Sequence, residues 1–106
     1  MATDWAADIK KYAPDADDAV IAKVLSTYRL VLSNRDSAYV ATGSPEERAT
    51  VRKSFLKGKL GLTDDDATLD AAIADVAAKM KADRTKSRAT VYYLLAEKFG
   101  KLDVFR

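Results

Sequence analysis

Apolar residues recur at helical spacing in five segments of this chain, each bounded by residues that begin or end helices. The clearest segment starts at Ser44, which is suited to cap a helix, with Pro45 at the first helical position and Glu47 placed to complete a capping box. The apolar residues that follow at helical spacing are Val51, Phe55, Leu56 and Leu60. Gly61 comes directly after them, so we predict a helix from Pro45 that ends at this glycine.

Four other segments follow the same rule. They cover residues 4–13, 15–33, 63–83 and 86–99, and Pro14 and Gly100 mark two of the ends. With 106 residues, of which 48% are hydrophobic, the chain has enough apolar side chains for one core and no room for a second domain. We therefore predict an all-α fold, a compact bundle of about five helices over residues 1–106, with the second and fifth helices at its centre.

Acidic residues cluster at two places, residues 15–18 and 64–66. A calcium-binding loop needs oxygen ligands at alternating positions, a central glycine and a distant glutamate, and neither cluster has that spacing. Both clusters lie at predicted helix starts, where carboxylates accept hydrogen bonds from free backbone amides. We interpret them as helix caps and expect no metal site.

The chain contains no cysteine and no histidine. This excludes disulfides, thiolate nucleophiles, cysteine zinc sites and the Ser-His-Asp triad, and it removes the usual general base near neutral pH. The start of the chain, with neither a basic region nor an apolar run, does not resemble a secretory signal, and no apolar stretch is long enough to span a bilayer. We expect a cytoplasmic protein with no membrane association and no cofactor.

The approach to the last predicted helix reverses the charge pattern of the others. With 18 basic and 16 acidic residues, the chain has a net charge of only +2, so any electrostatic partner must be recognised by a local patch. Most helices start acidic and end basic, but here positive charges precede a helix start, where the dipole already disfavours them. The residues are Arg84, Thr85, Lys86, Ser87 and Arg88. Helix-start amides, hydroxyls and cations together predict an anion-binding corner, for a phosphate or carboxylate of a ligand or acidic partner. The alternative is a solvated linker whose cations pair with neighbouring acids.

Nucleic-acid binding is a further alternative for this corner, although the basic bias is weak and no recognition helix is evident. Tyr93 lies almost opposite the predicted core face of the last helix, so it is either a surface aromatic available for stacking or packed under a second neighbour.

The segment 33–45 is the longest part of the chain without clear periodicity. Its polar residues include Arg35, Asp36 and Ser37, which could line a pocket. An enzyme would need Asp36 or a glutamate as base in a closed pocket, because without histidine a neighbouring serine has no evident activating partner. The alternative is that Arg35 and Asp36 pair locally while Tyr39 and Val40 turn inward.

Several segments, taken in order, resemble a bacterial family known as domain of unknown function 2853. They are residues 12–15 (Tyr-Ala-Pro-Asp), 34–37 (Asn-Arg-Asp-Ser), 44–47 (Ser-Pro-Glu-Glu), 57–62 (Lys-Gly-Lys-Leu-Gly-Leu) and 88–95 (Arg-Ala-Thr-Val-Tyr-Tyr-Leu-Leu). The resemblance implies a small helical protein and carries no activity, cofactor or catalytic residue with it. From the residues themselves we predict a small non-enzymatic binding or interaction module, a monomer or a homodimer.

Overall fold

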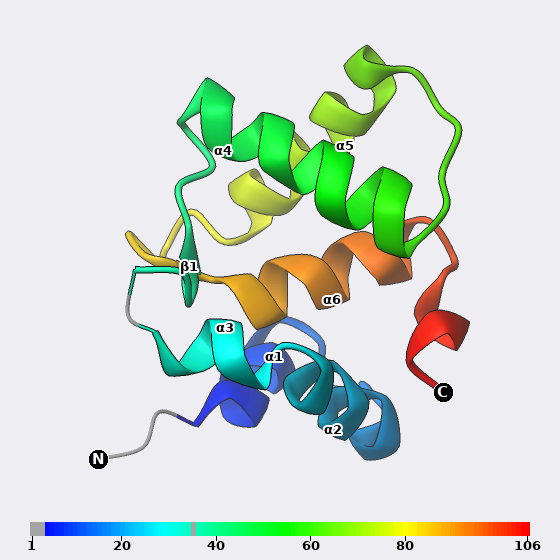
Figure 1. The fold of residues 1–106 in the computed structure, drawn as a ribbon. Coiled ribbons are helices and arrows are strands. Elements are labelled where there is room, and N and C mark those ends of the chain that lie inside the picture. The colour runs from blue at the N-terminus through cyan, green and yellow to red at the C-terminus, as the bar shows by residue number, and fades with distance from the viewer. Residues whose placement is uncertain (1–3, 35) are drawn as a thin grey trace.

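The computed structural model describes residues 4–34 and 36–106, and the predicted all-α fold is confirmed (Figure 1). Its helices are α1 (Trp5–Tyr12), α2 (Asp18–Thr27), α3 (Arg29–Ser33), α4 (Pro45–Thr50), α5 (Asp66–Lys79) and α6 (Arg88–Lys98). A π-helix (Val51–Lys59) continues α4, and a 3₁₀ helix (Leu102–Phe105) follows α6. Two short strands, β1 (Tyr39–Val40) and β2 (Lys86–Ser87), complete the elements.

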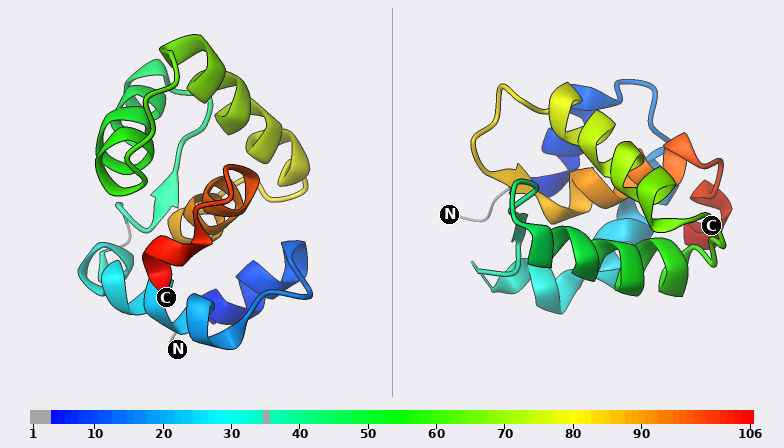
Figure 2. Two further views of the ribbon diagram at one scale, coloured as in Figure 1. Left: turned by 90° about the vertical axis from the view of Figure 1, so that its right-hand side faces the viewer. Right: turned by 90° about the horizontal axis from the view of Figure 1, so that it is seen from above.

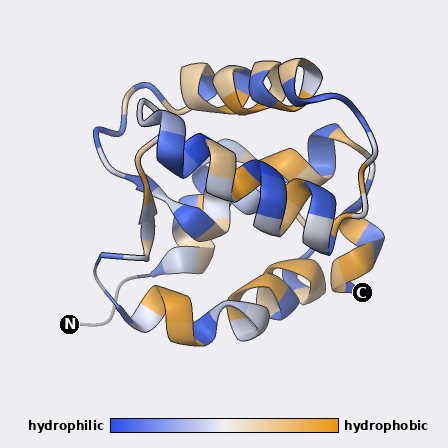
Figure 3. Ribbon diagram, turned by 45° about the horizontal axis from the view of Figure 1, so that its top comes forward, coloured by the Kyte–Doolittle hydropathy of each residue, from blue (hydrophilic) through white to orange (hydrophobic). Residues whose placement is uncertain are grey.

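Helix α6 is at the centre of the molecule. It lies between a layer formed by α1, α2 and α3 and a layer formed by α4, the π-helix and α5 (Figure 2). Residues 88–96 are all buried, because α6 has neighbours on more than one side. Most other helices alternate hydrophilic and apolar stretches, as expected where only one face is buried (Figure 3).

The burial of α6 decides between the two alternatives for Tyr93. Its side chain is only 2% exposed, so it is not a surface aromatic. The helical periodicity of α6 identified one apolar face, but a helix covered on several sides also buries residues opposite that face. Tyr93 is therefore unavailable for stacking on a nucleic-acid base.

The second predicted helix is two helices, because the chain bends at Tyr28. This residue ends α2 and precedes α3 with φ −107° and ψ 19°. Its ring packs edge-on against Tyr92, with centroids 5.0 Å apart, and also contacts Phe55 at 6.2 Å. The Phe55 ring is in turn stacked on Tyr92 at 3.9 Å. This aromatic cluster fills the space where the layers meet α6.

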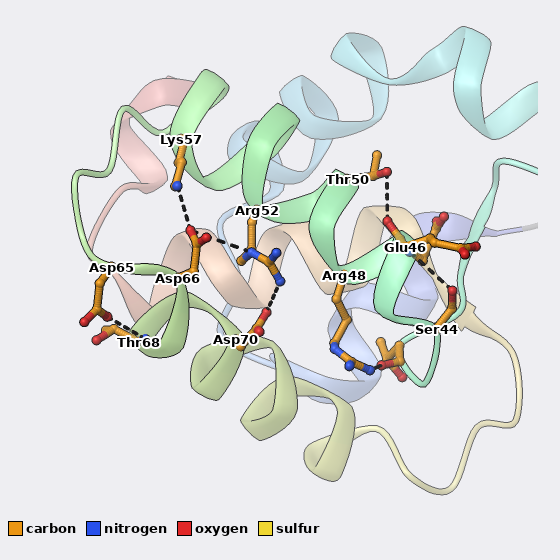
Figure 4. Close-up of polar contacts among 12 residues, drawn as sticks. Ser44, Glu46, Arg48, Thr50, Arg52, Lys57, Asp65, Asp66, Thr68 and Asp70 are labelled. Atoms are coloured by element: carbon orange, nitrogen blue, oxygen red, sulfur yellow. Dashed lines mark hydrogen bonds and ion pairs between the residues drawn. The ribbon is translucent and has the colours of Figure 1, made fainter.

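The boundaries predicted from caps and glycines are largely confirmed. Asp17 and Asp65 accept hydrogen bonds from the first-turn amides of α2 and α5, both at 2.8 Å. Ser44 caps α4 by accepting from the Glu47 amide at 3.3 Å. Gly61 comes directly after the end of the helical segment, as predicted, and its φ of +69° is one that residues with a side chain rarely adopt. Figure 4 shows the caps at Ser44 and Asp65, and the ion pairs of Arg52 with Asp70 and of Lys57 with Asp66.

The π-helix and the strands were not predicted. In the π-helix the backbone bonds span five residues, as between the Leu60 amide and the Phe55 carbonyl at 2.9 Å, and the helix keeps the same apolar residues buried. The strands pair antiparallel, with Tyr39 opposite Ser87 and Val40 opposite Lys86. This β-ribbon, residues 39–40 and 86–87, fastens the 33–45 segment to the start of α6.

Among the helices of residues 4–34 and 36–106, none is long and apolar enough to cross a bilayer.

Candidate ligand-binding cleft

Arg88, a member of the predicted anion-binding corner, is a buried residue that joins several elements. Its side chain donates to the Ser37 carbonyl at 2.6 Å, the Tyr92 hydroxyl at 2.8 Å and the Glu47 carboxylate at 2.6 Å. Its overall exposure is 8%. The Glu47 side chain therefore does not close the predicted capping box but neutralises Arg88. Arg88 is not free to hold an external anion, which corrects its predicted role.

The other four residues of the corner divide into inward and outward groups. Ser87 is buried and caps α6, accepting from the Thr90 amide at 3.5 Å. Lys86 is half-buried, and its ammonium group donates to the Asp83 carbonyl oxygen at 2.9 Å. Arg84 and Thr85 are exposed.

The amides at the start of α6 are also engaged. The Arg88 amide donates to the Ala38 carbonyl at 2.8 Å, and the Thr90 amide is capped by Ser87. The structure thus leaves Arg84, Thr85 and part of Lys86 accessible for the predicted role, without the two helix-start donors.

Among residues 33–34 and 36–45, neither Asp36 nor Ser37 is placed as the enzyme alternative required. Asp36 is exposed, and its amide bonds to the Asn34 side chain at 2.9 Å. The Ser37 hydroxyl donates to the Val31 carbonyl at 2.7 Å, so it is held by backbone and not by a base. Val40 is buried and Tyr39 half-buried, as the inward-facing alternative predicted. Arg35 lies outside the described residues.

A cleft of about 400 Å³ lies between α1, β1 and the segment that leads into α6. Its lining combines residues from both ends of the sequence: Asp4, Trp5, Ala7, Asp8, Lys11, Tyr39, Asp83, Thr85 and Ser87. Sequence reasoning missed this cleft, because its lining comes from segments that are far apart in the chain. The nearest available indication was the i, i+4, i+7 spacing of Asp4, Asp8 and Lys11, which places two carboxylates and an ammonium group on one side of a short helix.

Two aromatic rings form one wall of the cleft. Trp5 and Tyr39 are both half-buried, with ring centroids 5.7 Å apart and planes inclined at 64°. The rings meet edge to face, and each residue keeps part of its surface accessible.

The carboxylates of the cleft are held in place by short contacts. Asp83 accepts hydrogen bonds from the Tyr12 hydroxyl at 2.6 Å and the Lys11 ammonium at 2.9 Å. These two donors hold the pKa of Asp83 below its usual value, so it is ionised at neutral pH. Asp8 accepts from the Thr90 hydroxyl, and Asp4 accepts from the Ala7 amide at 2.9 Å as the cap of α1.

The cleft carries negative charge next to the corner that was predicted to be positive. Its lining contains three carboxylates and one ammonium group, which leaves two negative charges. Within the part of the chain that the structure describes, no three acidic side chains are grouped closely enough to hold a metal ion. Carboxylates beside aromatic rings are groups that an organic cation can contact.

The comparisons with known proteins define the class of protein but not its activity. The chain belongs to the family described as "protein of unknown function (DUF2853)", whose model matches residues 4–103. A search of curated proteins gave no match. The family carries no site to transfer, so the functional argument depends on the geometry of the cleft.

Proposed function

We propose that this protein is a small binding module whose cleft between α1 and the β-ribbon takes a positively charged organic group, an ammonium or a guanidinium, from its ligand. The observation that carries the proposal is the meeting of the Trp5–Tyr39 wall with the carboxylates of Asp4 and Asp8 around one hollow. Aromatic faces attract cations through the ring quadrupole, and carboxylates form charge-assisted hydrogen bonds with them.

The size of the cleft supports a small ligand group. A volume of about 400 Å³ is near the lower end of the usual range for ligand sites. Cation–π and charge-assisted contacts at a partly exposed site contribute on the order of 1 to 2 kcal/mol each, which for a few contacts corresponds to a Kd of about 1 mM. We therefore expect weak binding of an isolated cation.

The proposal concerns binding and not catalysis. The chain lacks cysteine and histidine, and the Asp83 carboxylate already accepts hydrogen bonds from Tyr12 and Lys11. We also propose a cytoplasmic location, which the absence of cysteine favours.

Trp5 is the chain's single tryptophan, so its fluorescence reports on the cleft directly. We expect a saturable change on titration with N-acetyl-argininamide at constant ionic strength, with a millimolar midpoint, and no change with the neutral N-acetyl-citrullinamide. The double variant Asp4→Asn/Asp8→Asn, which keeps oxygen acceptors at both positions, should weaken binding about tenfold, a loss of about 1.4 kcal/mol. The exposed Asp64→Asn, outside the cleft lining, is the matched control and should bind as the wild type does.

A melting-temperature measurement, combined with the fluorescence titration, tests the anion-binding alternative at Arg84, Thr85 and Lys86. If inorganic phosphate raises the melting temperature at matched ionic strength and Arg84→Gln abolishes the effect, while N-acetyl-argininamide leaves Trp5 fluorescence unchanged, the cation proposal is wrong and the basic corner is the better site. Salt-dependent retention of DNA or RNA on a filter would extend that result to the nucleic-acid alternative.

A further inference from the structure

A second hollow, also of about 400 Å³, lies beside the cleft, between α1 and α2. We call it the α1–α2 groove. Its apolar lining residues are Ala6, Ala7, Ile21, Ala22 and Leu25, and its charged ones are Asp4, Lys10 and Asp18. Lys10 and Asp18 form an ion pair with each other, so Asp4 is the remaining charge. The groove is therefore mainly an apolar surface with a carboxylate at one end of α1.

The cleft and the groove share Asp4 and Ala7. Around α1, Trp5 and Asp8 line only the cleft, while Ala6 and Lys10 line only the groove, and Ala7 lies between the two sets. Because alanine has only a methyl group, the ridge that separates the hollows is low. The two hollows therefore adjoin at Asp4 and Ala7, with the Lys10 side chain on the groove side and the Lys11 side chain on the cleft side.

We infer that the partner is a short extended peptide segment, with a basic side chain in the cleft and an aliphatic side chain, two positions along the segment, in the α1–α2 groove. This inference rests on the proposed cation-binding function. In an extended chain, residues i and i+2 project to the same side about 7 Å apart, so a segment that crosses α1 at Ala7 can direct one side chain toward each hollow. The negative charge of the cleft selects the basic residue, and the apolar lining of the groove selects the aliphatic one.

The aliphatic position is tested with a pair of peptides, acetyl-Arg-Gly-Leu-amide and acetyl-Arg-Gly-Ser-amide, titrated against Trp5 fluorescence. We expect the leucine peptide to bind the wild-type protein about tenfold more tightly, because it buries part of an aliphatic side chain in the groove. Ala22→Gln places a longer neutral side chain in the groove from an exposed helical position, and it should remove this difference. Ala71→Gln, an exposed alanine of α5 outside both hollows, is the matched control and should preserve it.

The outcomes separate this inference from the function on which it rests. If N-acetyl-argininamide does not bind, both the proposed function and the peptide inference are wrong. Binding of N-acetyl-argininamide together with equal affinities for the two peptides would overturn the peptide inference alone. Light scattering provides a further test. If the protein is a dimer at the titration concentration and Ala22→Gln dissociates it, the groove is an interface between copies of this chain and the peptide inference is wrong.

Discussion

The guanidinium of Arg88 lies 2.6 Å from the carboxylate of Glu47, joining the first turn of α6 to the first turn of α4 across 41 residues of sequence. Arg88 and Glu47 were each assigned other roles by local sequence patterns, an external anion ligand and a capping-box acid. Pairing satisfies both charges in a place where water has little access, with side-chain exposures of 10% for the arginine and 28% for the glutamate. The positive charge at the start of α6 is thus a structural element of the interior.

Removing the acid from this pair should destabilise the protein, because a buried guanidinium would lose its counter-charge. We expect Glu47→Gln to lower the free energy of unfolding by about 1 to 3 kcal/mol. The neighbouring Glu46→Gln changes the same charge on an exposed residue and should lie within about 0.5 kcal/mol of the wild type. Urea denaturation of both variants provides the measurement, and equal stabilities would show that the pair is unimportant.

The glycine after the π-helix should tolerate substitution less well than a glycine in a loop. Gly61 has a φ of +69°, so Gly61→Ala should cost about 1 to 2 kcal/mol in stability. Gly43 has no positive φ and has open space where a Cβ would lie, so Gly43→Ala should be neutral or slightly stabilising. The two melting temperatures, measured side by side, test whether the helix ends as described.

Two leucines of α3 lie two positions apart, and so on nearly opposite sides of the helix. Leu32 is 8% exposed, whereas Leu30 is 80% exposed. We expect Leu32→Ala to lower the free energy of unfolding by about 2 to 4 kcal/mol and Leu30→Ala to change it by less than about 0.5 kcal/mol. Chemical denaturation of the two variants distinguishes these values, and a reversed order would mean that α3 presents its other face to the core.

The contacts of Asp83 should be visible in its titration. The Tyr12 hydroxyl is the largest influence that lowers the pKa of Asp83, followed by Lys11. Tyr12→Phe should therefore raise this pKa toward the ordinary value near 3.9, as measured by carboxyl-carbon NMR. Because the folded-state pKa is the lower one, the associated stability is present above about pH 4 and is lost as the pH falls through the folded value. An unchanged pKa in Tyr12→Phe would contradict the described contact.

Features governed by neighbouring residues in the sequence were predictable. The caps at Asp17, Ser44 and Asp65 and the terminating Gly61 depend on a few consecutive residues, so their sequence patterns identified the helix starts and one end directly. The helical periodicity likewise supplied the fold class.

Features that depend on distant residues were missed. The bend at Tyr28 accompanies packing on Tyr92, and the β-ribbon pairs residues 39–40 with residues 86–87. A pattern of neighbouring residues cannot predict contacts between residues so far apart in the sequence. The cleft is the same case, since Trp5 and Asp83 meet only when α1 packs beside the approach to α6. The predicted anion-binding corner overlaps the cleft at Thr85 and Ser87, but the lining of the cleft carries a net negative charge and not the positive charge that was predicted there.

The central position of α6 has a consequence for how the protein acquires its structure during synthesis. Helices α1 to α5 all precede α6 in the chain, so they leave the ribosome before the surface on which several of them pack exists. Short helices without their tertiary partners are only marginally formed. The nascent chain is therefore expected to remain loosely ordered, with apolar faces exposed to chaperones, until residues 88–96 emerge and the two layers close around them.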